Sequence, residues 1–153
     1  MPANFSIIEA GLEDSGDILA WRNHPDTRAN SVNGDEISEQ DHAIWYKQKL
    51  ASDLCTLYVA RNESNVNIGM VRFDIDADAQ TANISIAIAP AEKGKGLAAP
   101  LLRRAIETFD RLELVLCASV KNGNTPSKKC FERNGFTVFD DKSTFLIYQK
   151  IQR

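Results

Sequence analysis

The part of the sequence best suited to chemistry is a basic, glycine-bearing loop at residues 90–98. It is predicted to join a strand to the first turn of an amphipathic helix, where backbone N–H groups lack partners and the helix dipole favours an anion. Gly94 and Gly96 leave the backbone bare, so phosphate oxygens can approach the amides closely. Lys93 and Lys95 add local positive charge in a chain of formal net charge −3. The loop therefore predicts a phosphate-binding site; the alternative is a flexible turn with solvated charges.

Two common phosphate-binding patterns do not fit this loop. The pattern GxxxxGK[ST] is absent from the sequence. Residues 94–99 superficially match a dinucleotide-binding fingerprint, but that motif has its first glycine directly after the strand and an acidic residue at the end of the next strand. Here four residues intervene after Ala89, and the next predicted strand ends at Ser119 without an acid. The sequence thus disfavours both types of nucleotide site.

The elements that must position this loop are predicted from hydrophobic periodicity. Ile84, Ile86 and Ile88 alternate with polar or small residues, as in a strand, and an apolar helical stripe follows the loop. A parallel strand pair follows from the strand–helix–strand order. The predicted strands are residues 5–9, 54–61, 66–76, 82–89, 112–119, 136–139 and 144–151, and the predicted helices are residues 12–23, 38–50, 97–109 and 124–134. This order predicts an α+β (mixed α/β) fold, with a mixed, mostly antiparallel sheet of about seven strands and about four helices.

Composition limits the classes of function. A chain of 153 residues, 43% hydrophobic and 25% charged, predicts a single globular domain over residues 1–153. The net charge of −3 and the absence of a long apolar run predict neither nucleic acid nor a membrane as partner. The first ten residues carry no Lys or Arg, so no secretory signal is expected. Three scattered cysteines favour a reducing cytoplasm, and two histidines without a cysteine cluster predict no metal site.

Two blocks of the sequence share their spacing with a known family. The first block is Lys93-x-x-Gly96-x-Ala98. The second block consists of Asn124, Ser127, Phe131, Gly135 and Phe136. They resemble the [Q/R]-x-x-G-x-[G/A] loop and the N-x-x-[A/S]-x-x-x-Y-x-x-x-G-F segment of the GNAT superfamily of acyl-CoA-dependent N-acetyltransferases, with Lys in place of the usual Gln or Arg. The two blocks occur in the family's order, and the predicted order of elements also fits.

This resemblance implies acetyl-CoA as co-substrate and a GNAT-like fold in which the parallel strand pair splays apart. In the family, the pantetheine arm lies in that gap, and the pyrophosphate lies on the amides of the glycine-bearing loop. The amine attacks the thioester directly, without an acyl-enzyme, and the backbone N–H of Ile88 is the candidate donor to the oxyanion. The cofactor-binding residues implied by the resemblance are Ile86, Ile88, Lys93, Gly94, Lys95, Gly96, Leu97, Ala98, Asn124 and Phe131.

Phe131 departs from the family pattern. The family commonly has a Tyr there, whose phenol can protonate the departing thiolate, and Phe131 has no proton to give. A thiol pKa of about 8.5 makes thiolate a fair leaving group at neutral pH, and Ser127 or Ser85 is a candidate donor instead. Phe131 is then expected either to pack against the pantetheine arm or to lie in the core.

In the family, the first two helices and their connection usually bind the acceptor amine. This part of the sequence carries a second, narrower resemblance. The run Arg22-Asn23-His24-Pro25 and the pattern from Ile37-Ser38 to His42 resemble the N-acetyltransferases of the pseudaminic-acid pathway, which acetylate the 4-amino group of a UDP-linked amino sugar. Arginines could supply bidentate donors to the diphosphate, and His42 could relay a proton from the amine. The residues expected to bind the acceptor are Arg22, Asn23, His24, Arg28, Arg72, Asn83 and Ser85.

The sequence leaves alternatives open at this end. Arg22 and Arg28 are also typical of solvated helix ends, and His42 of a structural histidine. Trp21 and Trp45 are expected in the core rather than as a platform for uracil. The sequence predicts an N-acetyltransferase acting on a small-molecule amine, foremost a UDP-linked amino sugar. The alternatives are acetylation of a protein N-terminus or of another small amine, or a non-catalytic acyl-CoA-binding module. A homodimer is left open.

Overall fold

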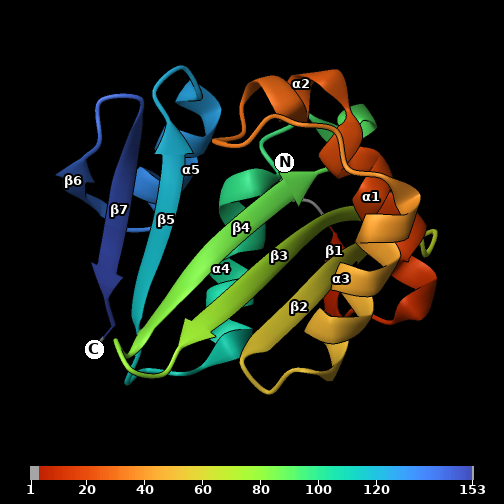
Figure 1. Ribbon diagram of the computed structural model, residues 1–153, viewed down its shortest axis with the longest axis horizontal. Coiled ribbons are helices and arrows are strands. Elements are labelled where there is room, and N and C mark those ends of the chain that lie inside the picture. The colour runs from red at the N-terminus through yellow and green to blue at the C-terminus, as the bar shows by residue number, and fades with distance from the viewer. Residues whose placement is uncertain (1–3, 153) are drawn as a thin grey trace.

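A computed structural model describes residues 4–152, and a seven-stranded sheet runs through its centre (Figure 1). The strand order is β1-β2-β3-β4-β5-β7-β6. All neighbouring strands are antiparallel except β4 and β5, which are parallel. The strands are β1 (Phe5–Glu9), β2 (Cys55–Asn62), β3 (Asn67–Asp76), β4 (Thr81–Ile88), β5 (Val115–Lys121), β6 (Thr137–Asp141) and β7 (Phe145–Ile151). The predicted mixed, mostly antiparallel sheet is confirmed.

Five α-helices flank the sheet on its two faces, with α1 and α3 in front of it and α4 behind it in Figure 1. They are α1 (Ser15–Asn23), α2 (Pro25–Ala29), α3 (Glu39–Ala51), α4 (Ala98–Phe109) and α5 (Thr125–Arg133). Short 3-10 turns lie at Leu12–Asp14 and Pro90–Glu92. Among the described residues, none of the helices has the length and apolarity needed to cross a bilayer.

Each face of the sheet carries its own hydrophobic core, because successive strand residues point to opposite faces. On one face, Phe73 of β3 is fully buried and its ring stacks on Phe109 of α4, with centroids 4.1 Å apart. On the other face, Met70 of the same strand packs with Trp21 of α1 and Tyr46 of α3. Trp21 is therefore a core residue, as predicted.

The region before β2 differs most from the prediction. One helix was expected over residues 12–23, but a 3-10 turn precedes α1, and Asp14 at the junction accepts from the backbone N–H of Gly11 at 2.8 Å. Pro25 ends α1 as predicted, and it also begins α2, which was not predicted. Proline suits the first helical turn, where its missing N–H costs nothing. Residues 4–152 thus form five α-helices rather than about four.

The parallel contact between β4 and β5 is short. The register pairs residues 81–83 with residues 115–117 only, whereas β4 pairs with β3 along its whole length, from Thr81 to Ile88. Beyond Asn83 the two parallel strands separate. The splayed pair predicted from the family resemblance is therefore present.

Candidate active site

The separation of β4 from β5 leaves backbone groups of β4 without strand partners. The N–H of Ala89 donates to the carbonyl of Ile68 on β3 at 2.9 Å, so residue 89 faces β3. Because backbone N–H groups alternate in direction along a strand, those of Ile86 and Ile88 face the gap. On the same even-numbered side, the carbonyl of Gln80 accepts from β5 at 3.0 Å. The backbone of Ile86 and Ile88 is thus available to a ligand.

A cleft of about 730 Å³ opens at this gap. Its walls come from the end of β4, the loop before α4, the start of α5 and the end of α2. The residues expected to hold a cofactor that line it are Ile86, Ile88, Lys93, Gly94, Gly96, Leu97, Ala98 and Asn124. Ser127, the expected proton donor, lines it too. The sequence therefore identified nine of the twenty residues that line this cleft.

The loop before α4 presents a run of free amides to the cleft. Gly94 and Gly96 adopt φ angles of 81° and 74°, in the left-handed region that other residues rarely enter. Leu97 occupies the cap position of α4, and its apolar side chain cannot cap the helix. Within residues 4–152, the backbone N–H groups of residues 94–99 have no hydrogen-bond partner. Free amides at a helix N-terminus suit a phosphate or pyrophosphate group.

At the start of α5, on the same cleft, the backbone N–H groups already have partners within the protein. Asn124 caps the helix, its side chain accepting from the backbone N–H of Ser127 at 3.3 Å. The N–H of Thr125 donates to the carbonyl of Gly123 at 3.1 Å, and Pro126 has no N–H. This helix therefore offers side chains rather than amides to the cleft.

Several lining residues were not predicted from the sequence. They include Thr27, Asn30 and Ser31 at the end of α2, Glu92 in the loop, and Lys129, Cys130 and Arg133 on α5. The residues on α5 follow the helical spacing from Pro126, and this spacing was a usable signal. No local sequence pattern predicted α2. Three cations against one acid make the lining basic, in agreement with an anionic ligand.

The end of α2 is tied to the cofactor side of the cleft. The ammonium of Lys121 on β5 donates to the carbonyl of Ala29 at 2.8 Å. The ammonium of Lys93 lies 3.5 Å from the hydroxyl of Thr27. Although α2 is short, these contacts hold it as a wall of the cleft.

Two predicted cofactor residues lie off the lining. Phe131 is 3% exposed and packs edge-on against Phe136, with ring centroids 5.1 Å apart. It is a core residue, which agrees with one of the two expected alternatives, and it does not line the cleft. Lys95 pairs with Glu92 at 3.2 Å and also does not line the cleft. The Lys95 side chain is 63% exposed to solvent, whereas Gly94 and Gly96 on either side of it line the cleft.

No phenol lines the cleft within the described residues. The hydroxyl of Tyr148, beside Phe131, donates to Glu132 at 2.8 Å. Burial, together with this carboxylate, raises the pKa of Tyr148 to about 12. Tyr148 therefore does not replace the tyrosine that the family places at position 131.

Arginines expected to bind the acceptor hold the segment after α2 in place. Arg22 donates from Nη2 to the carbonyl of Asn33 at 2.6 Å, and Arg28 donates from Nε to that of Gly34 at 3.0 Å. Both arginines keep further N–H groups, and Nη1 of Arg22 is buried without a partner in the described chain. The sequence could not show this fastening role, because the acceptors are backbone carbonyls of residues 30–38.

Asn23 and His24 also have local partners. The Asn23 side chain donates to the carbonyl of Ile37 at 2.7 Å and accepts from its N–H at 2.8 Å. Nδ1 of His24 accepts from the backbone N–H of Asp26 at 3.2 Å, capping α2. These contacts fit the helix-stop alternative for residues 23–25.

Three arginines nevertheless gather on the acceptor side. Burial first, then the positive charges of Arg28 and Arg72, lowers the pKa of Arg22. Arg72 donates from Nη2 to the hydroxyl of Ser85 at 3.0 Å, and its guanidinium lies 4.8 Å from the ring centroid of Trp45. The structure thus brings Arg22, Arg28, Arg72 and Ser85 into one region. Asn83 is exposed at the last β4–β5 pair.

His42 lies away from the cleft. It is 4% exposed, stacks on Tyr46 with ring centroids 5.4 Å apart, and lies beside Trp45. Burial lowers the pKa of His42. Its Nε2 is buried without a hydrogen-bond partner among the described residues, and His42 does not line the cleft, so the proton relay stays a prediction.

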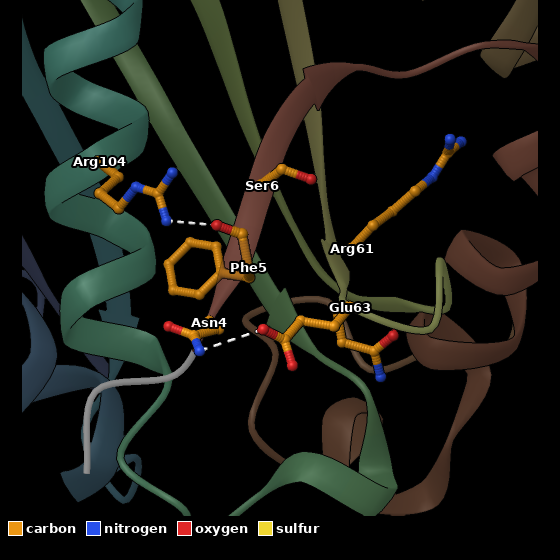
Figure 2. A pocket seen from close by; sticks show the side chains of 7 residues that line it. Asn4, Phe5, Ser6, Arg61, Glu63 and Arg104 are labelled. Atoms are coloured by element: carbon orange, nitrogen blue, oxygen red, sulfur yellow. Dashed lines mark hydrogen bonds between the residues drawn. The ribbon is translucent and has the colours of Figure 1, made fainter.

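A second cavity, of about 310 Å³, lies beside β1 (Figure 2). Arg104 reaches from α4 to the carbonyl of Phe5, and its guanidinium lies 4.3 Å from the centroid of that ring. Asn4 donates to Glu63 at 3.2 Å. Arg61, which also lines this cavity, donates to Asp14 at 2.9 Å and to Asn67 at 3.0 Å, so most of its charged groups already have protein partners. Among the described residues, no group of three or more His, Cys, Asp or Glu side chains is placed to hold a metal ion.

Comparison with known families decides the assignment. The sequence profile described as acetyltransferase (GNAT) domain matches residues 7–137. The chain belongs to this family. The prediction of an acetyl-CoA-dependent N-acetyltransferase is thereby confirmed. No curated protein sequence matches this GNAT acetyltransferase significantly.

Solved structures show the same fold. A spermidine N-acetyltransferase from Vibrio cholerae, in complex with CoA and spermine, superposes with a TM-score of 0.81 at 20% identity, covering 95% of this chain and 93% of that one. An N-acetyltransferase from Staphylococcus aureus Mu50 gives 0.81 at 22% identity, with 99% and 100% coverage. A domain from Methanocaldococcus jannaschii DSM 2661 gives 0.77 at 18% identity, with 97% and 98% coverage. At these identities the likeness concerns the fold.

Proposed function

We propose that this GNAT protein transfers an acetyl group from acetyl-CoA to the primary amine of a small molecule by direct attack. One observation carries the proposal: a single cleft is lined by Gly94 and residues 96–99, whose amides are free, and by the free backbone of Ile86 and Ile88. The amides suit the pyrophosphate of CoA, and the strand backbone suits the two amide groups of a pantetheine arm. A ligand that carries both groups fits this combination.

The residues of the cleft supply the chemistry of acyl transfer. A neutral amine attacks the thioester carbonyl, and the N–H of Ile88 stabilises the oxyanion that develops. The thiolate then departs, and no nucleophilic side chain of the protein is needed to carry the acetyl group. Cys130 lines the cleft, but burial raises the pKa of its thiol to about 12, so it remains protonated and is a poor nucleophile.

For the acceptor, we keep a UDP-linked amino sugar as the specific proposal. The grouping of Arg22, Arg28 and Arg72 supports it, because the N–H groups not used by the protein can serve a diphosphate. Another small amine or a protein N-terminus is the alternative. The cytoplasm is the proposed compartment, supported by three free cysteines, Cys55, Cys117 and Cys130. A homodimer stays a prediction.

Release of free thiol from acetyl-CoA tests this function. We expect thiol release with an amino sugar, faster for its UDP form than for the free sugar. Arg22→Ala should raise KM far more for the UDP form than for a plain amine, and the difference should shrink as salt is added. Equal rates on both sugars would reject the nucleotide. Binding of acetyl-CoA without thiol release from any amine would favour the non-catalytic alternative.

A further inference from the structure

The amide of Asn124, the cap residue of α5, has an orientation fixed by its partners. Its Oδ1 accepts from the backbone N–H of Ser127 at 3.3 Å, and a backbone N–H can only donate. Its Nδ2 must therefore point the other way, where it donates to Oγ of Ser127 at 3.0 Å. The carbonyl of Asn30, which can only accept, lies 3.5 Å from the same Nδ2. The three contacts require one orientation.

This orientation leaves the hydroxyl proton of Ser127 available. The oxygen already accepts from Asn124, and within residues 4–152 the hydroxyl donates to no protein group. Ser127 is half-buried and lines the cleft together with Ile86 and Ile88. A donor that is held in place, yet has no acceptor in the protein, is suited to a negative charge that appears only during the reaction.

From this contact we infer that Asn124 is a positioning residue that directs the hydroxyl of Ser127 at the departing sulfur. The inference rests on the proposed acetyl transfer. Ser127 then supplies the hydrogen-bond donor that the chain lacks at position 131, because Phe131 is buried in the core and carries no donor. Asn124 thus links the cap of α5 to the leaving group.

The step balances without ionising the serine. The bond between the amine nitrogen and the carbonyl carbon forms, the carbon–sulfur bond breaks, and its electron pair goes to sulfur. The amine nitrogen loses one proton to solvent, and the sulfur leaves as a thiolate that accepts a hydrogen bond from Ser127. A thiol pKa of about 8.5 allows this departure, whereas a serine hydroxyl is too weak an acid to transfer its proton outright.

Asn124→Asp separates this role from capping. Aspartate is as good a cap as asparagine and suits a helix N-terminus, so the melting temperature should be unchanged or higher. Its carboxylate, however, can only accept, and it would draw the Ser127 proton away from the cleft. We expect kcat to fall on the order of ten- to a hundredfold, as for Ser127→Ala, because a hydrogen bond to a charged group is lost. The rates are compared at saturating acetyl-CoA, so that a change in cofactor affinity does not enter kcat.

The double variant Asn124→Asp/Ser127→Ala distinguishes proton direction from added charge. If Asn124 acts through Ser127, the aspartate adds no further loss in the alanine background. Asn122→Asp is the matched control: it adds the same charge two residues earlier, outside the cleft lining, and should keep the wild-type kcat.

Three results would overturn the inference: full kcat in Ser127→Ala, full kcat in Asn124→Asp, or losses that add in the double variant. Failure of the proposed function looks different. In that case the wild type itself releases no thiol with any amine, whatever residue stands at position 124.

Discussion

Two helices begin on the same cleft, and their first turns are built in opposite ways. The start of α4 has no capping side chain, two glycines at positive φ, and free amides over residues 94–99. The start of α5 has an asparagine cap, a proline in its first turn, and N–H groups bonded within the protein. The sequence thus marks which helix end is left open for a ligand: the absence of a cap residue is informative when glycines precede the helix.

The largest expected effect comes from blocking the free amides at the start of α4. Gly96→Glu places a carboxylate against the free amides and forces a side chain into a φ of 74°. Acetyl-CoA at roughly 100 times its Kd should stabilise the wild type by about 2.7 kcal/mol, and this gain should vanish in the variant. The measurement is thermal unfolding with and without acetyl-CoA.

Two controls separate charge from strain in that experiment. Gly96→Ala keeps the strain, on the order of 1–3 kcal/mol of stability, without the carboxylate, so it should still respond to acetyl-CoA. Gly123→Glu makes the same substitution beside the start of α5, where a new side chain meets no atom within 4 Å, and should keep the full response. An unchanged response in Gly96→Glu would contradict the assignment of the loop.

A smaller effect, on the free energy of unfolding, is expected from removing the cap of α5. Asn124→Ala removes the cap of α5 and should lower the free energy of unfolding by about 1 kcal/mol in the absence of ligand. Urea denaturation of the two proteins measures it. Unchanged stability would mean that the two helix starts differ less than their hydrogen bonds indicate.

Little effect on activity is expected from a substitution at position 131. Because Phe131 is buried in the core and off the cleft lining, Phe131→Tyr should leave activity within about tenfold, a barrier change below roughly 1.4 kcal/mol. A hundredfold gain would instead show that a missing acid limits the rate.

The smallest expected effect is the absence of a feature in the pH–rate profile. A phenol that acts as acid loses its proton near its pKa, and activity then falls on the alkaline side. The pKa of Tyr148 is raised to about 12, and this residue does not line the cleft. We therefore expect no falling limb near pH 10 in the wild type. Such a limb, abolished by Tyr148→Phe, would show that this phenol acts on the reacting atoms.

The cofactor side could be predicted from the sequence because its signals are local. Glycines, lysines and a helix start lie within a few residues of one another, and the alternation of Ile84, Ile86 and Ile88 marks the strand that precedes them. Only the pairing of β4 with β3 decides which of its N–H groups face the gap. The family resemblance added the splay, which ends the β4–β5 pairing at Asn83. The side on which Phe131 points was left open by the sequence and is decided by its packing on Phe136.

The acceptor side could be predicted less well because its contacts are not local. Arg22 and Arg28 bind carbonyls six to eleven residues away, in a segment without periodicity. His42 fits a catalytic pattern in the sequence, yet it is buried on α3 beside Trp45 and Tyr46. α2 escaped prediction because five residues are too few to show helical periodicity.

The two cores on opposite faces of the sheet have a consequence for evolvability. Phe73 and Phe109 pack on the face that carries α4, whereas Trp21 and Tyr46 pack with Met70 on the face that carries α1 and α3. Substitutions in α1 and α3 therefore repack mainly the second core, and the loop that begins α4 keeps its packing on the first. The proposed acceptor side can thus change in sequence while the core beneath the loop of residues 94–99 is inherited unchanged.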